Sequence, residues 1–286
     1  MRIGFEEKIY ENYFNAELDR RSRIFFPPGQ VQEGLLGFDS SADSRNRFLW
    51  RRLGYPFWFF PHFSGVELRE IARDLERWLN VVIDDIPQIR ANLIFQYKKP
   101  EFMVTANSKE WQYWNEPYYR YNIYQSQQSI LNRIDGQFGN QILVIYASPK
   151  ARNINELVRL KTSRNIINAS NFKKASDLNG HHRNTYISSG TFSIACSKPE
   201  RIDDLDLLQE MEIIGNDSKQ ELSNRQLIVR FSNEIKKIIS EDKYYGEPFL
   251  ELLEDSYSFK NHELIESFKI MNIFKQITGL QWLAKI

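Results

Sequence analysis

The sequence contains little of what builds disulfide-linked or zinc-stabilised proteins. Cys196 is the single cysteine among 286 residues, which excludes an internal disulfide framework and a cysteine-rich zinc site. Histidine is scarce too, with 4 residues in the chain. His181 and His182 are adjacent, and no third ligand stands at a spacing suited to a metal site. The sequence therefore disfavours metal sites built from cysteine or histidine.

Long apolar runs are also missing. The mean hydropathy is −0.52. No segment approaches the roughly 20 apolar residues that a membrane-spanning helix requires. The first residues, MRIGFEEK, are charged where a secretory signal peptide is apolar. We expect a cytoplasmic protein that has no membrane partner.

The chain does have apolar material and an uneven distribution of charge. Hydrophobic residues make up 42% of it, which is enough for a large core. Residues 1–197 hold 26 basic and 20 acidic side chains, whereas residues 198–286 hold 12 and 17. Residues 150–183 alone carry 8 basic and 2 acidic side chains. Such a basic segment is typical of contact with a polyanion, although a solvated surface accounts for it equally well.

The spacing of apolar residues predicts a mixed α/β core in residues 1–198, with an aromatic insertion at about 40–90. We expect helices at 5–20, 65–80 and 117–134, strands at 31–39, 91–98 and 141–147, a partly helical stretch at 150–183 and a hairpin at 184–197. Residues 199–286 are expected to be mainly helical, in segments at 201–213, 222–242, 248–256 and 262–285. The apolar faces of these helices suit packing, a homodimer or a protein partner.

Three residues at strand ends could act together on a phosphate group. Asp39 ends one expected strand, and Gln96 and Lys98 share a face of the next long one because side chains alternate along a strand. Hydrolysis of a phosphodiester uses a hard cation such as Mg²⁺ or Mn²⁺, held by oxygen ligands. Asp39 and Gln96 could supply these oxygens. The Lys98 amine could position the attacking water and offset negative charge on the phosphate.

This arrangement resembles the PD-(D/E)XK nuclease superfamily, in particular the Mrr-type restriction endonucleases, in which glutamine replaces the second acidic residue. The matching stretches are GFDS at 37–40, FQYKKPE at 95–101, the helix at 117–134 and QILVIYASP at 141–149. The resemblance covers about residues 5–149. It implies a restriction-endonuclease-like mixed sheet flanked by helices, with Asp39 and Gln96 as metal ligands and Lys98 as the catalytic lysine.

The resemblance also implies accessory residues. Related proteins often add an acidic residue from the first helix, for which Glu7 and Glu11 are candidates. They often add a glutamine or a basic residue from the helix after the lysine strand, for which Gln127 or Gln128 fits. Glu33 shares the strand face of Asp39 and could join the site.

Two departures from the family pattern leave alternatives open. Asp39 and Gln96 are 57 positions apart (96 − 39), so residues 40–90 must be an insertion, and Asp84 or Asp85 could be the acidic residue instead. Gln96 is neutral and holds Mg²⁺ less strongly than a carboxylate does. A weakened or inactive site is therefore an alternative.

A second polar cluster lies at residues 170–186. Lys173, Lys174 and Arg183 could contact phosphates, and Tyr186 could stack on a base or form a hydrogen bond. His181 or His182 could protonate a leaving oxygen or position the substrate, but adjacent side chains on a strand face opposite ways. A surface loop without function is the alternative interpretation.

The leading hypothesis is therefore a metal-dependent nuclease of restriction or defence type, with DNA as the expected substrate and RNA as the alternative. One alternative is a catalytically inactive nucleic-acid-binding module on a nuclease scaffold. Another is a metal-independent ribonuclease that uses His181 or His182. The last is an assembly protein whose helical C-terminal region binds a partner.

Overall fold

The protein has a mixed α/β fold, as the sequence predicts. The computed structural model describes residues 4–27, 41–42, 66–217, 221–256, 258–259 and 261–286. Contacts divide the chain into two units, the first made of Met1–Ile24, Arg90–Ser218 and Lys285, and the second mainly of Phe25–Ile89 and Lys219–Ala284. The sequence predicts one boundary at 198/199. The second unit instead combines a segment from the first part of the chain, Phe25–Ile89, with the C-terminal segment Lys219–Ala284.

The first unit contains three consecutive strands of one sheet. These strands are β4 (Ala91–Tyr97), β7 (Ile142–Pro149) and β8 (Ser170–Lys174). β4 and β7 are parallel, with Gln96 opposite Tyr146, while β8 runs antiparallel to β7. All of β7 is buried, as expected for an apolar run covered on both faces. The predicted strands at 91–98 and 141–147 are confirmed, whereas β8 was not expected within the basic segment.

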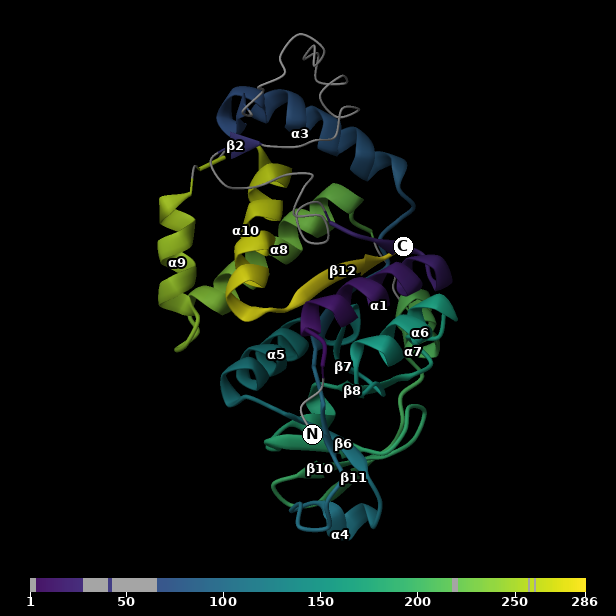
Figure 1. Ribbon diagram of the computed structural model, residues 1–286. Coiled ribbons are helices and arrows are strands. Elements are labelled where there is room, and N and C mark those ends of the chain that lie inside the picture. Colours follow the sequence, from purple (N-terminus) through teal and green to yellow (C-terminus); the bar gives the residue numbers. More distant parts are fainter. Residues whose placement is uncertain (1–3, 28–40, 43–65, 218–220, 257, 260) are drawn as a thin grey trace. The chain divides into compact units, whose positions relative to one another are not determined.

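Helices cover both faces of this sheet (Figure 1). Helix α1 (Glu7–Arg21) lies on one face, where the ring of Phe14 is centred 5.5 Å from the rings of Phe95 and Tyr97. Helix α5 (Gln125–Phe138) lies on the other, where Gln128 accepts a hydrogen bond from the Tyr146 hydroxyl. The sheet is thus packed on both sides, by aromatic contacts on one and by polar contacts on the other.

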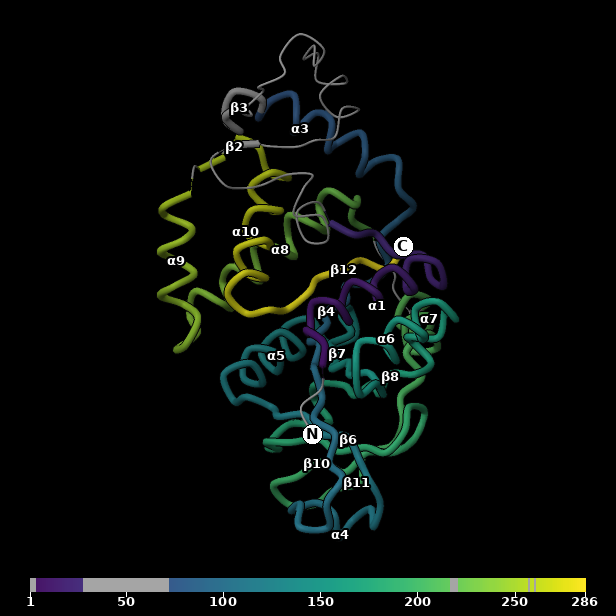
Figure 2. Tube along the Cα trace, viewed as in Figure 1, coloured from purple at the N-terminus to yellow at the C-terminus, as the bar shows by residue number. Residues whose placement is uncertain are grey.

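A second sheet of the first unit is antiparallel throughout, and Figure 2 traces its strands side by side. Its order is β11-β10-β9-β6-β5. The strands are β5 (Glu101–Met103), β6 (Tyr118–Asn122), β9 (Arg183–Tyr186), β10 (Ser193–Cys196) and β11 (Glu200–Ile202). β9 and β10 form the hairpin predicted at 184–197, and Gly190 adopts a positive φ of 66° in its turn.

The helix predicted at 117–134 is wrong in its first part. Residues 118–122 form strand β6, and α5 begins only at Gln125. The stretch is rich in tyrosine, which favours strands when both faces are covered. The rings of Tyr119 and Tyr121 stack on those of Tyr186 and Tyr146, at 5.4 and 6.0 Å between centroids. Tertiary packing therefore overrides the local helical pattern. The remaining helices of this unit are α4 (Trp111–Trp114), α6 (Ile154–Thr162) and α7 (Leu207–Asp217).

The second unit is mainly helical. Its helices are α3 (Leu68–Asp85), α8 (Asn224–Ser240), α9 (Gly246–Asp255) and α10 (Glu263–Thr278), and its strands include β2 (Ser41–Ala42), β3 (Val66–Glu67) and β12 (Gln281–Lys285). A capping box of Ser223 and Gln226 begins α8. The predicted helix at 262–285 is wrong at its end, because Gly279 terminates α10 with a φ of 73° and a strand follows. In the described part of the chain, no helix has the length and apolar character needed to cross a membrane.

Candidate functional site

Gln96 and Lys98 lie on the face of the first sheet that α5 covers. Side chains alternate along β4, so Phe95 and Tyr97 pack against α1 while Gln96 points to the opposite face. Lys98 follows the last residue of the strand, and its backbone amide still donates to the carbonyl of Ala147 at 2.9 Å. The strand geometry therefore extends through Lys98 and keeps its side chain on the side of Gln96.

The amine of Lys98 is enclosed by polar and aromatic groups. Only 6% of the residue is exposed, and Nζ donates a hydrogen bond of 2.8 Å to Oε1 of Gln127. Nζ also lies over the rings of Tyr124 and Tyr146, at 5.0 and 5.7 Å from their centroids. Burial lowers the pKa of Lys98 to about 8, although the nearby Glu7 carboxylate opposes this shift. The side chain is thus held in place and is close to its titration point at neutral pH.

Glu7 places a carboxylate at the same end of β4. It lies in the first turn of α1, and its Oε2 accepts a hydrogen bond of 3.1 Å from the backbone amide of Lys99. Burial raises the pKa of Glu7, while the positive charge of Lys98 lowers it in part. An acid and an amine that influence each other therefore flank this strand end.

Gln96 offers a buried oxygen. Only 2% of the residue is exposed, and its amide nitrogen donates to the carbonyl of Tyr97 at 2.7 Å. Within the described residues, Oε1 of Gln96 has no hydrogen-bond partner. A buried acceptor without a donor is unfavourable by about 1–3 kcal/mol. This oxygen is therefore suited to a water molecule or a cation.

The predicted acidic ligand, Asp39, lies outside the described residues, as does Glu33. Asp84 and Asp85 end helix α3 in the second unit. Across the described ranges, no group of three or more His, Cys, Asp or Glu side chains gathers in a way that could hold a metal. Near this strand end, the described residues offer a cation the Glu7 carboxylate and the Gln96 side-chain oxygen. Water would have to supply further ligands. Mg²⁺ commonly binds proteins through one or two carboxylates and several waters.

Gln128 joins structural elements. The residue is 1% exposed, its Oε1 accepts from the Tyr146 hydroxyl at 2.9 Å, and its Nε2 donates to the Ala175 carbonyl at 2.7 Å. It therefore ties α5 to β7 and to the residue after β8, whereas Gln127 contacts the amine of Lys98.

The two lysines predicted to contact phosphates are held by protein groups. Lys173 is fully buried on β8, and its amine donates to the Asp203 carbonyl at 2.7 Å. Burial lowers the pKa of Lys173 to about 8, against the opposing charge of Asp204. Lys174 forms an ion pair of 2.8 Å with Glu210. The structure does not bring these lysines to Lys98, which lies beyond the intervening strand β7.

The other residues of the 170–186 cluster have different environments. His181 is buried with Nε2 3.2 Å from Glu200, whereas His182 is exposed and its Nδ1 lies 2.8 Å from the Ser197 hydroxyl. Tyr186 is fully buried, and its hydroxyl lies 2.9 Å from the Ser148 hydroxyl. Of this group, His182 therefore reaches solvent, while the ring of Tyr186 belongs to the core.

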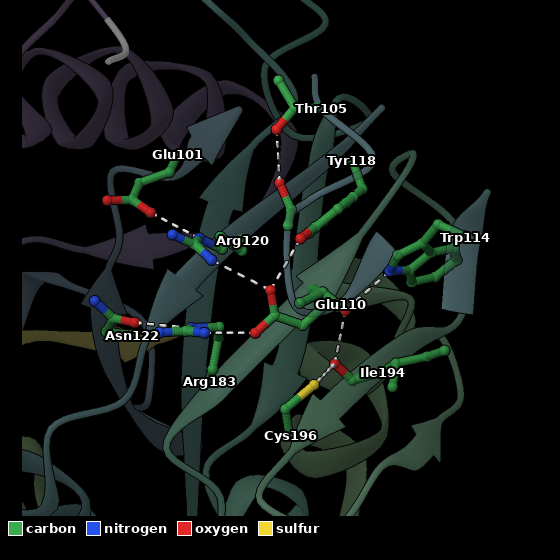
Figure 3. A network of polar contacts seen from close by, with 12 residues as sticks. Glu101, Thr105, Glu110, Trp114, Tyr118, Arg120, Asn122, Arg183, Ile194 and Cys196 are labelled. Carbon is green, nitrogen blue, oxygen red and sulfur yellow. Dashed lines mark hydrogen bonds and ion pairs between the residues drawn. The ribbon is translucent and has the colours of Figure 1, made fainter. Parts of the chain in front are cut away.

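A buried ion network on the second sheet was not foreseen. Glu110 is 4% exposed and accepts hydrogen bonds from Arg183, from Arg120 at 3.2 Å and from the Tyr118 hydroxyl at 2.9 Å (Figure 3). These contacts lower the pKa of Glu110 despite its burial. Nothing in the local sequence singles out Glu110, because its partners lie on two strands that are far apart in the chain. Arg183 therefore pairs with a carboxylate in this structure.

Comparison with known proteins identifies no similar protein. No protein-family model matches the chain, and searches of curated proteins and of solved structures find no match. The functional interpretation therefore rests on the chemistry of the residues and on their geometry.

Proposed function

We propose that this chain is a nuclease that depends on Mg²⁺ or Mn²⁺ and hydrolyses phosphodiester bonds, with its active site at the end of β4. The observation that carries the proposal is the environment of Lys98. The Lys98 side chain is 6% exposed and is held by Gln127 near the Glu7 carboxylate, and a buried amine with a lowered pKa beside an acid is a candidate catalytic group.

The order of elements supports the proposed likeness to restriction endonucleases. An initial helix supplies an acid, a strand supplies Gln96 and Lys98, and then α5 and a strand parallel to the first one follow. This order agrees with part of what the family resemblance implies, and the expected strand at 31–39 lies outside the described residues. The insertion of β5, α4 and β6 between β4 and α5 is a feature of this chain.

Each residue has a distinct role in this proposal. Glu7 and Gln96 are the proposed oxygen donors for the cation, while the role of Asp39 stays a prediction from the sequence. When bound, the cation polarises the phosphate and lowers the pKa of a bound water. The ammonium group of Lys98 holds an oxygen of the substrate and offsets the negative charge that develops in the transition state. Gln127 orients this ammonium group by accepting a hydrogen bond from it.

The experiment that tests the proposal is a cleavage assay on the purified chain. DNA and RNA, each single-stranded and duplex, are incubated with Mg²⁺, with Mn²⁺ and with EDTA. We expect cleavage with either cation and none in EDTA, with DNA cut faster than RNA. Cleavage of RNA that survives EDTA would contradict the proposal and indicate chemistry at the exposed His182. Binding without cleavage would contradict it in favour of an inactive nucleic-acid-binding scaffold.

A further inference from the structure

Tyr124 is exposed to an unusual degree. The rings of the neighbouring tyrosines Tyr118, Tyr119 and Tyr121 are buried, but 58% of Tyr124 is accessible to solvent. This is the largest exposure among the big apolar side chains in the described residues. The ring stands directly beside the proposed active site, with the Lys98 amine 5.0 Å from its centroid.

The backbone around Tyr124 is fixed on both sides, although the ring is solvated. The carbonyl of Tyr124 accepts the first hydrogen bond of α5, from the amide of Gln128 at 2.9 Å. The preceding residue, Ile123, is buried, and its amide donates to the carbonyl of His182 at 2.8 Å. The backbone that carries the ring is therefore fixed on both sides of Tyr124.

One face of the ring is turned to the Lys98 amine, which leaves the other face open to solvent. An exposed aromatic ring near a cation is the arrangement with which proteins bind unpaired nucleobases, and each stacked base contributes about 1–3 kcal/mol. A base inside a duplex already has neighbours on both faces and cannot stack on a side chain without leaving the helix.

We infer that Tyr124 stacks on an unpaired base next to the phosphate held at Lys98, so that single-stranded nucleic acid is the preferred substrate. This inference rests on the proposed nuclease function and gives it a substrate class.

The chain contains a matched control for the ring and its cation. Tyr244 in the second unit is 54% exposed, and the amine of Lys243 lies 5.1 Å from its ring centroid. This pair also sets a lysine amine over an exposed tyrosine ring, with Lys243 itself exposed, at a position without the Glu7 and Gln96 oxygens. A substitution of Tyr244 therefore shows how much oligonucleotide binding changes when the chain loses an exposed tyrosine outside the proposed site.

The test is a binding measurement in EDTA, where the proposed nuclease does not turn over. A single-stranded oligonucleotide containing 2-aminopurine is titrated with wild type, Tyr124→Ala, Tyr124→Trp and Tyr244→Ala, and duplex of the same sequence is titrated in parallel. We expect Tyr124→Ala to weaken single-strand binding about 10-fold and to reduce the fluorescence quenching that stacking causes. Tyr124→Trp and Tyr244→Ala should bind like wild type, and duplex affinity should not change with Tyr124→Ala.

Cleavage of the same oligonucleotide in Mg²⁺ separates this inference from the proposed function. If wild type cuts the strand and Tyr124→Ala binds as tightly as wild type does, the stacking role is wrong and the nuclease proposal stands. If binding depends on Tyr124 but no strand is cut, the stacking role stands and the nuclease proposal is wrong. If wild type binds neither strand nor duplex and cuts neither in Mg²⁺, both are wrong.

Discussion

The amine of Lys98 donates a hydrogen bond of 2.8 Å to Oε1 of Gln127, which joins the end of β4 to the first turn of α5. Gln127 gives the amine a fixed acceptor, and the rings of Tyr124 and Tyr146 limit its other directions. The position of the Lys98 ammonium group, which we propose to be catalytic, is thus set by elements that are separated in sequence.

Replacement of this acceptor should slow the chemical step without weakening substrate binding. In Gln127→Leu the amine of Lys98 loses its partner and its orientation, and we expect a fall of about 10- to 100-fold in the single-turnover cleavage rate. The dissociation constant of the oligonucleotide should stay within about twofold of wild type. Gln125→Leu, at the exposed start of the same helix, is the control and should cut like wild type. An unchanged rate in Gln127→Leu would show that Gln127 does not position Lys98.

A carboxylate at position 96 should strengthen cation binding. Oε1 of Gln96 is buried and has no partner within the described residues, so Gln96→Glu places a negative charge where we propose a neutral ligand. We expect Mn²⁺ to bind at least about 10-fold more tightly to this variant in calorimetric titration, and less tightly to Gln96→Met. Equal Mn²⁺ affinity in all three proteins would remove Gln96 from the cation site.

The Glu110 network should contribute strongly to stability. Glu110→Gln leaves Arg183 and Arg120 without the full charge of their buried partner, and we expect the free energy of unfolding in urea to fall by about 3 kcal/mol. The control is Glu101→Gln, because Glu101 also pairs with Arg120 but its side chain is 52% exposed. This variant should lose no more than about 1 kcal/mol. Similar losses in both variants would contradict the importance of burial at Glu110.

Lys173 should make stability depend on pH in the alkaline range. Its pKa is lowered to about 8 in the folded protein and is about 10.4 in an unfolded chain. Between these values the unfolded chain binds more protons, so the free energy of unfolding rises with pH as the penalty for a buried charge is removed. Lys173→Met lacks this penalty, so its advantage over wild type should shrink by about 2 kcal/mol between about pH 8 and pH 9.5.

Urea unfolding of both proteins at the two pH values checks this prediction. Lys174→Met is the neighbouring control, because the side chain of Lys174 is 38% exposed. The difference in free energy of unfolding between Lys174→Met and wild type should vary less with pH than the difference between Lys173→Met and wild type. If the free energies of unfolding of wild type and Lys173→Met differ by the same amount at both pH values, Lys173 stays charged in the folded protein.

The sequence predicts those parts of the fold in which local pattern and tertiary packing agree. The alternation in residues 91–98 placed Gln96 and Lys98 on one face, and the apolar run at 141–147 indicated an interior strand. The pattern failed where long-range contacts decide. Residues 118–122 form a strand because their tyrosines stack on Tyr146 and Tyr186 from other strands.

The site was predictable only in part for the same reason. Spacing could pair Gln96 with Lys98, because their side chains share a face, and the family resemblance suggested Glu7 or Glu11 and Gln127 or Gln128 without choosing between them. Nothing in the sequence shows that Lys173 is buried, because its environment is formed by residues about 30 positions away. Tyr124 and Glu110 carry no local signal either, since their roles arise from the strands and helices around them.

The most direct test of the account compares two adjacent lysines. Lys98→Met removes the amine that contacts Gln127, whereas Lys99→Met keeps the backbone amide that donates to Glu7 and removes only a neighbouring charge. With Mg²⁺ and a single-stranded DNA substrate, the account predicts that Lys98→Met cuts at least about 100-fold more slowly than wild type and that Lys99→Met cuts within about threefold of it. Equal cutting by Lys98→Met and wild type, with both proteins folded by circular dichroism, would contradict it.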